Sequence, residues 1–185
     1  SLNSLNQFQL RPTMTKEFRL FYPLHNPSLF SEIQNTLLPG AEQETRTDVY
    51  IALPNVSLGL KIRGGTASPL IELKVRSKRK ESGTEVWSKV LRKVLTSGND
   101  IHNEATAREI KELVSGAKLS PALIREICEA DLTTAPIISI AKCRYQGYLD
   151  RTVVGEVTKC VMPGGQEWVS VCAEGSKKVG KMGKN

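Results

Sequence analysis

Pairs of basic side chains recur at two-residue spacing within apolar segments of this chain. The pairs are Lys61 and Arg63, Lys74 and Arg76, and Lys142 and Arg144. Successive side chains of a β-strand point to opposite faces, so both members of a pair lie on the same face. Lys and Arg neutralise phosphate, and Arg can bind two phosphate oxygens at once. The pattern predicts either an anion-binding face or the ordinary solvated face of a half-buried antiparallel sheet.

Acidic residues accompany these basic side chains. Glu17 lies two residues before Arg19, and Glu72 lies two residues before Lys74, so each carboxylate shares a face with a cation. Carboxylate oxygens are ligands that Mg²⁺ prefers, and a metal held in this way stabilises charge during phosphoryl transfer. If such a face points inward, its cations repel one another in a low dielectric unless an anion lies between them.

The elements that position these residues are predicted from apolar periodicity and turn residues. Strands are expected over 15–22, 46–53, 57–63, 70–76, 137–145, 149–161 and 167–173, with a hairpin turn at 162–165. Helices are expected from Asn26-Pro27 to Pro39-Gly40, over 85–95, over 105–114, and from Ser120-Pro121 through Cys128.

This order of elements predicts an α+β domain over residues 15–175 in which one antiparallel sheet closes on itself, with a helical insert at about 84–130. Residues 1–14 are expected to form an N-terminal extension. Residues 176–185, rich in Lys and Gly, are expected to form a basic flexible tail.

The composition narrows the classes of function. A formal net charge of +7 on 185 residues favours polyanionic partners. Without a run of about 18 apolar residues, no membrane span is expected. Four cysteines without the spacing of zinc ligands are expected to be reduced, which predicts an intracellular location. These cysteines are Cys128, Cys143, Cys160 and Cys172.

Several motifs, taken in order, resemble those of the CYTH superfamily, the triphosphate tunnel metalloenzymes. The segment 15–19, Thr-Lys-Glu-Phe-Arg, resembles the opening E-x-E-x-K of that family, and Thr47-Asp48-Val49-Tyr50 resembles its D-x-Y strand. The further matches are Leu60-Lys61-Ile62-Arg63 with L-R-x-R, Ile71-Glu72-Leu73-Lys74 with the E-L-K strand, and Lys142-Cys143-Arg144 with K-x-R.

The resemblance implies a closed antiparallel β-tunnel that holds a triphosphate. Phosphate would be bound by Arg19, Lys61, Arg63, Lys74, Arg76, Lys142 and Arg144. Mg²⁺ or Mn²⁺ would be held by Glu17, Glu72, Glu156 and Glu174, and Glu17 and Glu72 would act in catalysis.

Two departures from the family bear on catalysis. Thr15 stands where the family has its first Glu, and Arg19 stands where it has Lys. Arginine does not release its proton near neutral pH, so Arg19 cannot act as a general base.

Three functions remain open. The first is a Mg²⁺- or Mn²⁺-dependent hydrolase of an organic or inorganic triphosphate. The second is a non-catalytic domain that binds polyphosphate or another polyanion in the same tunnel. The third is a nucleic-acid-binding domain that uses the basic loop Lys78-Arg79-Lys80 and the tail.

Overall fold

The computed structural model describes residues 13–64 and 69–175. Eight antiparallel strands close into one barrel in the order β1-β5-β4-β3-β2-β6-β7-β8. The strands are β1 (Thr13–Pro23), β2 (Gln43–Ile51), β3 (Leu58–Arg63), β4 (Leu70–Arg79), β5 (Glu85–Val94), β6 (Ile137–Tyr148), β7 (Val153–Val161) and β8 (Glu167–Gly175). The helices are α1 (Pro27–Leu37), α2 (Glu104–Ser115) and α3 (Pro121–Glu129). The predicted α+β fold with a closed antiparallel β-tunnel is confirmed.

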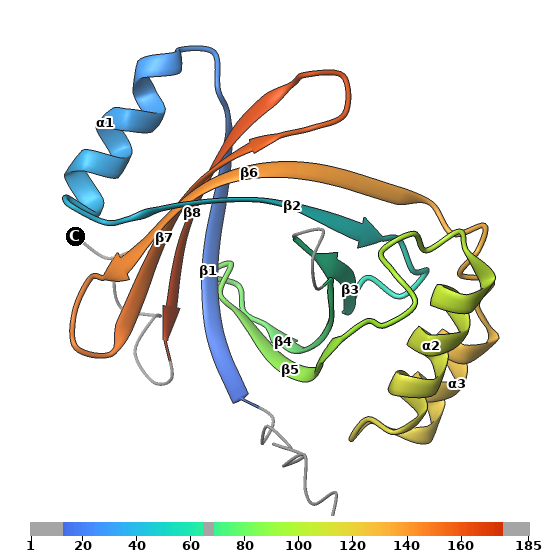
Figure 1. Cartoon of the computed structure of the whole chain (residues 1–185). Helices are drawn as coiled ribbons and strands as arrows, with labels where there is room; N and C mark the ends of the chain where they lie inside the picture. Colours follow the sequence, from blue (N-terminus) through green and yellow to red (C-terminus); the bar gives the residue numbers. More distant parts are fainter. Residues whose placement is uncertain (1–12, 65–68, 176–185) are drawn as a thin grey trace, which may run out of the picture.

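The outer face of β3, β4 and β5 is covered by α2 and α3, which lie at the opposite side of the barrel from α1 (Figure 1). Leu60 and Leu73 project outward from the strands into an apolar core that Ile110 of α2 and Ile127 of α3 complete. All four side chains are almost fully buried. Because this face is apolar and shielded, the alternate side chains of the same strands point into the barrel.

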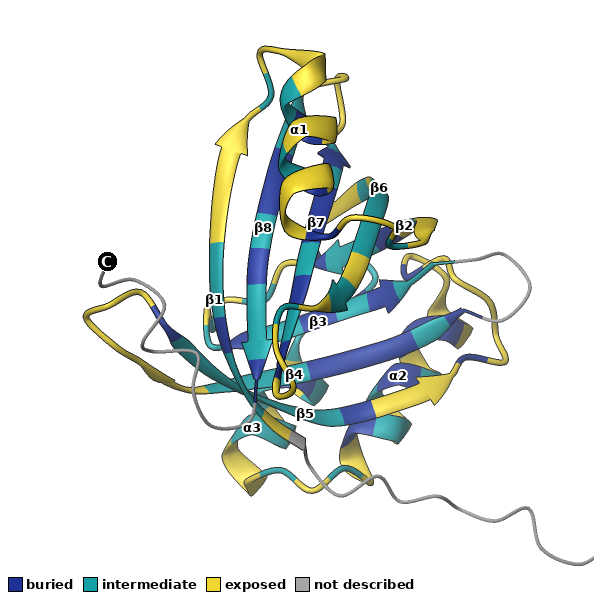
Figure 2. Ribbon diagram, turned by 90° about the vertical axis from the view of Figure 1, so that its left-hand side faces the viewer, coloured by how far each residue is buried: buried dark blue, intermediate teal, exposed yellow. Residues whose placement is uncertain are grey.

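Helix α1 covers the outer face of the other half of the barrel. Asn26 caps the helix by accepting a hydrogen bond from the backbone N–H of Ser28, as its position before Pro27 predicts. Phe30 then packs with Val157 and Val169 of β7 and β8, where buried positions alternate along the strands beneath α1 (Figure 2). The inner faces of these strands are thereby also turned toward the tunnel.

The helix predicted over 85–95 is wrong, because this segment is the strand β5. It pairs with β4 and with the first half of β1. A register shift opposite Leu73 and Lys74 leaves Val90 as an extra residue. The shift breaks the two-residue alternation and gives the apolar side chains a spacing that imitates a helix. The helical insert therefore reduces to α2 and α3.

Other boundaries differ less. β2 begins at Gln43 rather than at Arg46, and β1 begins at Thr13, inside the predicted N-terminal extension. The remainder of that extension, residues 1–12, and the predicted tail at 176–185 lie outside the described residues. Within 13–64 and 69–175, no helix is long and apolar enough to cross a membrane.

Candidate phosphate-binding tunnel

The basic side chains that were expected to converge on one interior space do converge. Lys61 from β3 and Lys142 from β6 reach the same carboxylate oxygen of Asp48, at 3.2 and 3.1 Å. Arg144 from β6 reaches Glu156 of β7 at 3.2 Å. The apolar residues that alternate with the basic ones on β3 and β4 pack in the core with α2 and α3; they are Leu58, Leu60, Ile62, Leu73 and Val75. The solvated-face alternative is therefore wrong for these strands.

Asp48 forms the centre of one ion-pair network. Its side chain is 0% exposed, and it also accepts a hydrogen bond from Arg46 Nε at 3.0 Å. Burial alone would raise the pKa of this carboxyl, but the charges of Lys61, Lys142 and Arg46 outweigh burial and lower the pKa to about 2. Lys142 also donates to the hydroxyl of Tyr50. Lys61 and Lys142 thus both form ion pairs with the buried Asp48.

Glu72 forms a second centre, in the middle of β4. Its side chain is 3% exposed, and three cations surround it, with Lys89 at 3.4 Å, Lys61 at 3.5 Å and Arg63 at 3.6 Å. Burial raises the pKa of Glu72, and the cations outweigh that effect and lower it. These contacts are longer than ordinary hydrogen bonds, and Glu72 Oε2 has no hydrogen-bond partner among the described residues.

Arg19 and Arg144 share the carboxylate of Glu156. Arg19 lies 2.9 Å from Glu156 and also donates to Ser170 Oγ at 2.8 Å. Burial alone would raise the pKa of Glu156, but the charges of Arg19 and Arg144 outweigh burial and lower the pKa to about 2. Burial lowers the pKa of Arg19, while the carboxylates of Glu156 and Glu17 raise it to a net value above its ordinary one. Arg19 therefore stays protonated and cannot accept a proton from water.

Carboxylates also line the tunnel where β1, β5 and β8 meet. Glu17 lies opposite Glu85 of β5 and opposite Glu174 of β8 in the strand register. Like charges in this arrangement repel, and cations from β4 compensate. Lys74 reaches Glu17 at 2.6 Å, and Arg76 reaches Glu85 at 2.6 Å.

The predicted metal ligands do not form a ready-made cluster among the described residues. Glu17, Glu72 and Glu156 face the tunnel, but each is already paired with Lys or Arg. Across 13–64 and 69–175, no three His, Cys, Asp or Glu side chains are placed to hold one ion. Mg²⁺ or Mn²⁺ would have to displace those cations first.

Sequence reasoning did not identify several charged residues that form ion pairs in the tunnel. Glu44 lies in the tunnel wall because β2 starts earlier than predicted, whereas Arg46 lay within the predicted strand and was given no role. The β5 bulge concealed Lys89. The motif Thr47-Asp48-Val49-Tyr50 includes Asp48 but assigns it no role. The alternation of Glu44, Arg46, Asp48 and Tyr50 at two-residue spacing was the available signal. The sequence predicted that inward cations would repel one another unless a bound anion lay between them. The structure differs, because carboxylates of the chain itself lie between several of these cations.

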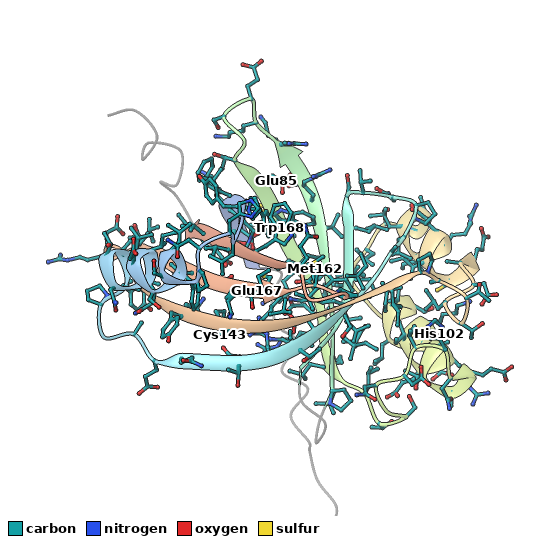
Figure 3. All side chains as sticks on the ribbon, turned by 90° about the horizontal axis from the view of Figure 1, so that it is seen from above. Glu85, His102, Cys143, Met162, Glu167 and Trp168 are labelled. Carbon is teal, nitrogen blue, oxygen red and sulfur yellow. The ribbon has the colours of Figure 1, made fainter. Side chains whose placement is uncertain are left out.

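Other reactive residues lie away from the tunnel. His102 lies beside α2 and α3, far from Glu85 on β5 (Figure 3), and its Nδ1 is 2.6 Å from the carbonyl oxygen of Thr133. Arg79, in the predicted basic loop, is 70% exposed at the end of β4. Arg79 reaches the tunnel network only through a 3.8 Å contact with Glu85 at its edge.

The comparisons with known proteins concern the fold. No protein-family model matches the chain, and no curated protein sequence matches it. A solved structure that does match is HpAC1 from Hippeastrum, a proposed adenylyl cyclase with a dominant triphosphatase activity. The TM-score is 0.57 at 18% identity, and the match covers 89% of this chain and 80% of that chain.

Two archaeal proteins match less well in shape. The conserved hypothetical protein from Pyrococcus furiosus has a TM-score of 0.46 at 19% identity, covering 89% of this chain and 80% of its own. The PH1012 protein from Pyrococcus horikoshii has a TM-score of 0.46 at 15% identity, covering 88% and 79%. The comparison therefore rests on HpAC1. The likeness to HpAC1 shows a shared fold, which in this chain is a closed eight-strand antiparallel barrel with basic side chains on its inner face.

Proposed function

We propose that the tunnel binds a triphosphate or a longer phosphate chain. The observation that carries this proposal is a surplus of guanidinium groups around Arg63. Arg63 lies opposite Asp48 of β2, two residues from Arg46. Arg46 lies opposite Lys142 of β6, two residues from Arg144, so Arg63 and Arg144 both lie diagonally across from Arg46. Burial lowers the pKa of Arg63, and the charges of Arg46 and Arg144 lower it further, against the smaller opposite effect of Glu72 and Asp48.

This surplus distinguishes the arginines from the lysines of the tunnel. Lys61 and Lys142 share the buried Asp48, whereas Arg144 Nε is buried without a hydrogen-bond partner among the described residues. An anion with several oxygens would satisfy such donors and relieve the repulsion among the guanidinium groups. The triphosphatase activity of HpAC1, which has the same fold, supports a triphosphate as that anion.

Tripolyphosphate is expected to stabilise the protein against unfolding. At a concentration about 100-fold above its Kd, the gain is about 2.7 kcal/mol, and a domain of this size would show a Tm increase of about 5–10 °C. The Arg144→Ala variant should show a smaller increase, because it removes one tunnel donor. Thermal unfolding with and without tripolyphosphate measures both values.

The matched control is Lys78→Ala, which removes one cation from the exposed end of β4. Its Tm increase should equal that of the wild type. A wild-type protein that tripolyphosphate does not stabilise would contradict the proposal. A gain that Lys78→Ala abolishes and Arg144→Ala leaves intact would favour the nucleic-acid-binding alternative.

Hydrolysis of the bound triphosphate with Mg²⁺ or Mn²⁺ is the second candidate function. It is favoured by the carboxylates Glu17, Glu72, Glu156 and Glu174 on the tunnel wall. Because Arg19 stays protonated, a carboxylate rather than Arg19 would have to activate the attacking water. If hydrolysis occurs, Glu17→Gln and Glu72→Gln should each lower turnover by orders of magnitude, as measured by metal-dependent phosphate release from tripolyphosphate. Robust turnover that ignores both substitutions and metal chelation would refute this assignment.

An intracellular location is proposed on chemical grounds. Cys128, Cys143, Cys160 and Cys172 all carry free thiols. Burial raises the pKa of Cys172 to about 12, which leaves its thiol protonated and unreactive. Unpaired cysteines of this kind are typical of proteins in a reducing compartment.

A further inference from the structure

The arginine cluster of the tunnel is bridged by one exposed carboxylate, that of Glu44. Arg46 NH1 donates to Glu44 Oε1 at 2.8 Å, and Arg144 NH2 donates to Glu44 Oε2. The two oxygens of one anion thus satisfy two guanidinium groups from neighbouring strands. A terminal phosphate offers the same arrangement with an additional oxygen and a higher charge.

Glu44 differs from the other carboxylates of the network in its access to water. Its side chain is 45% exposed, whereas Glu156 is 15% exposed and Asp48 is 0% exposed. Releasing a buried carboxylate from its partners carries a large penalty, while releasing a solvated one costs little. Glu44 is therefore the member of this network that can leave most easily.

The two arginines keep their positions when Glu44 leaves. Arg46 retains its bond to Asp48 through Nε, and Arg144 retains its contact with Glu156 through NH1. The unpartnered Nε of Arg144 also remains in place as a donor. The departure of Glu44 would thus open an anion site whose donors are already oriented.

We propose that Glu44 occupies the site of a ligand phosphate and that a phosphate chain must displace it in order to bind to Arg46 and Arg144. This inference rests on the proposed function and adds a regulatory element to the same tunnel. Glu44 acts as an internal competitor, so it weakens anion binding and selects for groups more highly charged than a carboxylate.

The test is the affinity of the whole chain for tripolyphosphate, measured by calorimetry for the wild type and for Glu44→Gln. The variant should bind about tenfold more tightly, because the ligand no longer displaces a charge-assisted bond, a difference of about 1.4 kcal/mol. Glu42→Gln is the matched control. It removes the same charge two residues away, from an exposed side chain, and its affinity should stay within about twofold of the wild type.

A second comparison separates displacement from a general change of charge. In an Arg144→Gln background, Glu44→Gln should no longer raise the affinity, because the bridged site is lost. Equal affinities of the wild type and Glu44→Gln, or an equal gain in Glu42→Gln, would overturn the inference while leaving the proposed function intact. If neither the wild type nor Glu44→Gln binds tripolyphosphate, the proposed function and the inference both fail.

Discussion

The Asp48→Asn variant is expected to lose about 3–5 kcal/mol of unfolding free energy, because the substitution leaves buried cations without their counter-charge. Asp48 is 0% exposed and compensates Arg46, Lys61 and Lys142 at once. An asparagine preserves the shape but replaces one acceptor oxygen with an NH₂ donor, so the loss combines the missing charge with a missing acceptor. Urea unfolding of the variant and the wild type gives the difference.

The control for this prediction is Glu44→Gln, which removes a carboxylate from the same network at an exposed position. Its loss is expected to be about 1 kcal/mol or less, because solvent compensates the released arginines. If Asp48→Asn and Glu44→Gln cost the same, Asp48 is not the buried centre of the tunnel network.

The Leu73→Ala variant is expected to lose about 2–5 kcal/mol, because it opens a cavity between β4 and the helices that cover it. Leu73 is 0% exposed in the core with α2 and α3. Arg76→Ala on the inner face of the same strand should cost about 1 kcal/mol or less, since Arg76 and Glu85 both keep contact with water. Thermal or urea unfolding distinguishes the two values.

A larger loss in Arg76→Ala than in Leu73→Ala would reverse the assignment of the two faces of β4. It would mean that the ion pairs inside the tunnel, rather than the apolar core outside it, hold the barrel together. The unfolding data therefore test whether the outer, apolar face of β4 contributes more to stability than its inner, charged face.

Alternation of side chains predicted the inner and outer faces of β3 and β4, because both strands have one apolar face under helices and one charged face in the tunnel. The caps of α1 and α3 were predictable for a local reason. Asn26 and Ser120 each precede a proline, and each caps its helix by accepting a backbone N–H bond. Such features depend on neighbouring residues alone.

The features that sequence reasoning missed depend on contacts between distant strands. The β5 bulge is visible only once β4 pairs with it, so Val90 and Leu91 suggested a helix. The role of Asp48 requires Lys142, which lies on another strand and far along the chain. The two-residue pattern indicated which cations face inward, but it could not show which carboxylate each cation meets.

The most direct test of a phosphate site inside the tunnel is a titration with tripolyphosphate, observed through the Nε–Hε NMR signals of the arginine side chains. Saturable shifts are expected for Arg46, Arg63 and Arg144, because their guanidinium groups would contact the anion. The signal of Arg79, which is 70% exposed at the end of β4, should not move. Shifts confined to Arg79, with the three tunnel arginines unchanged at saturation, would contradict the account.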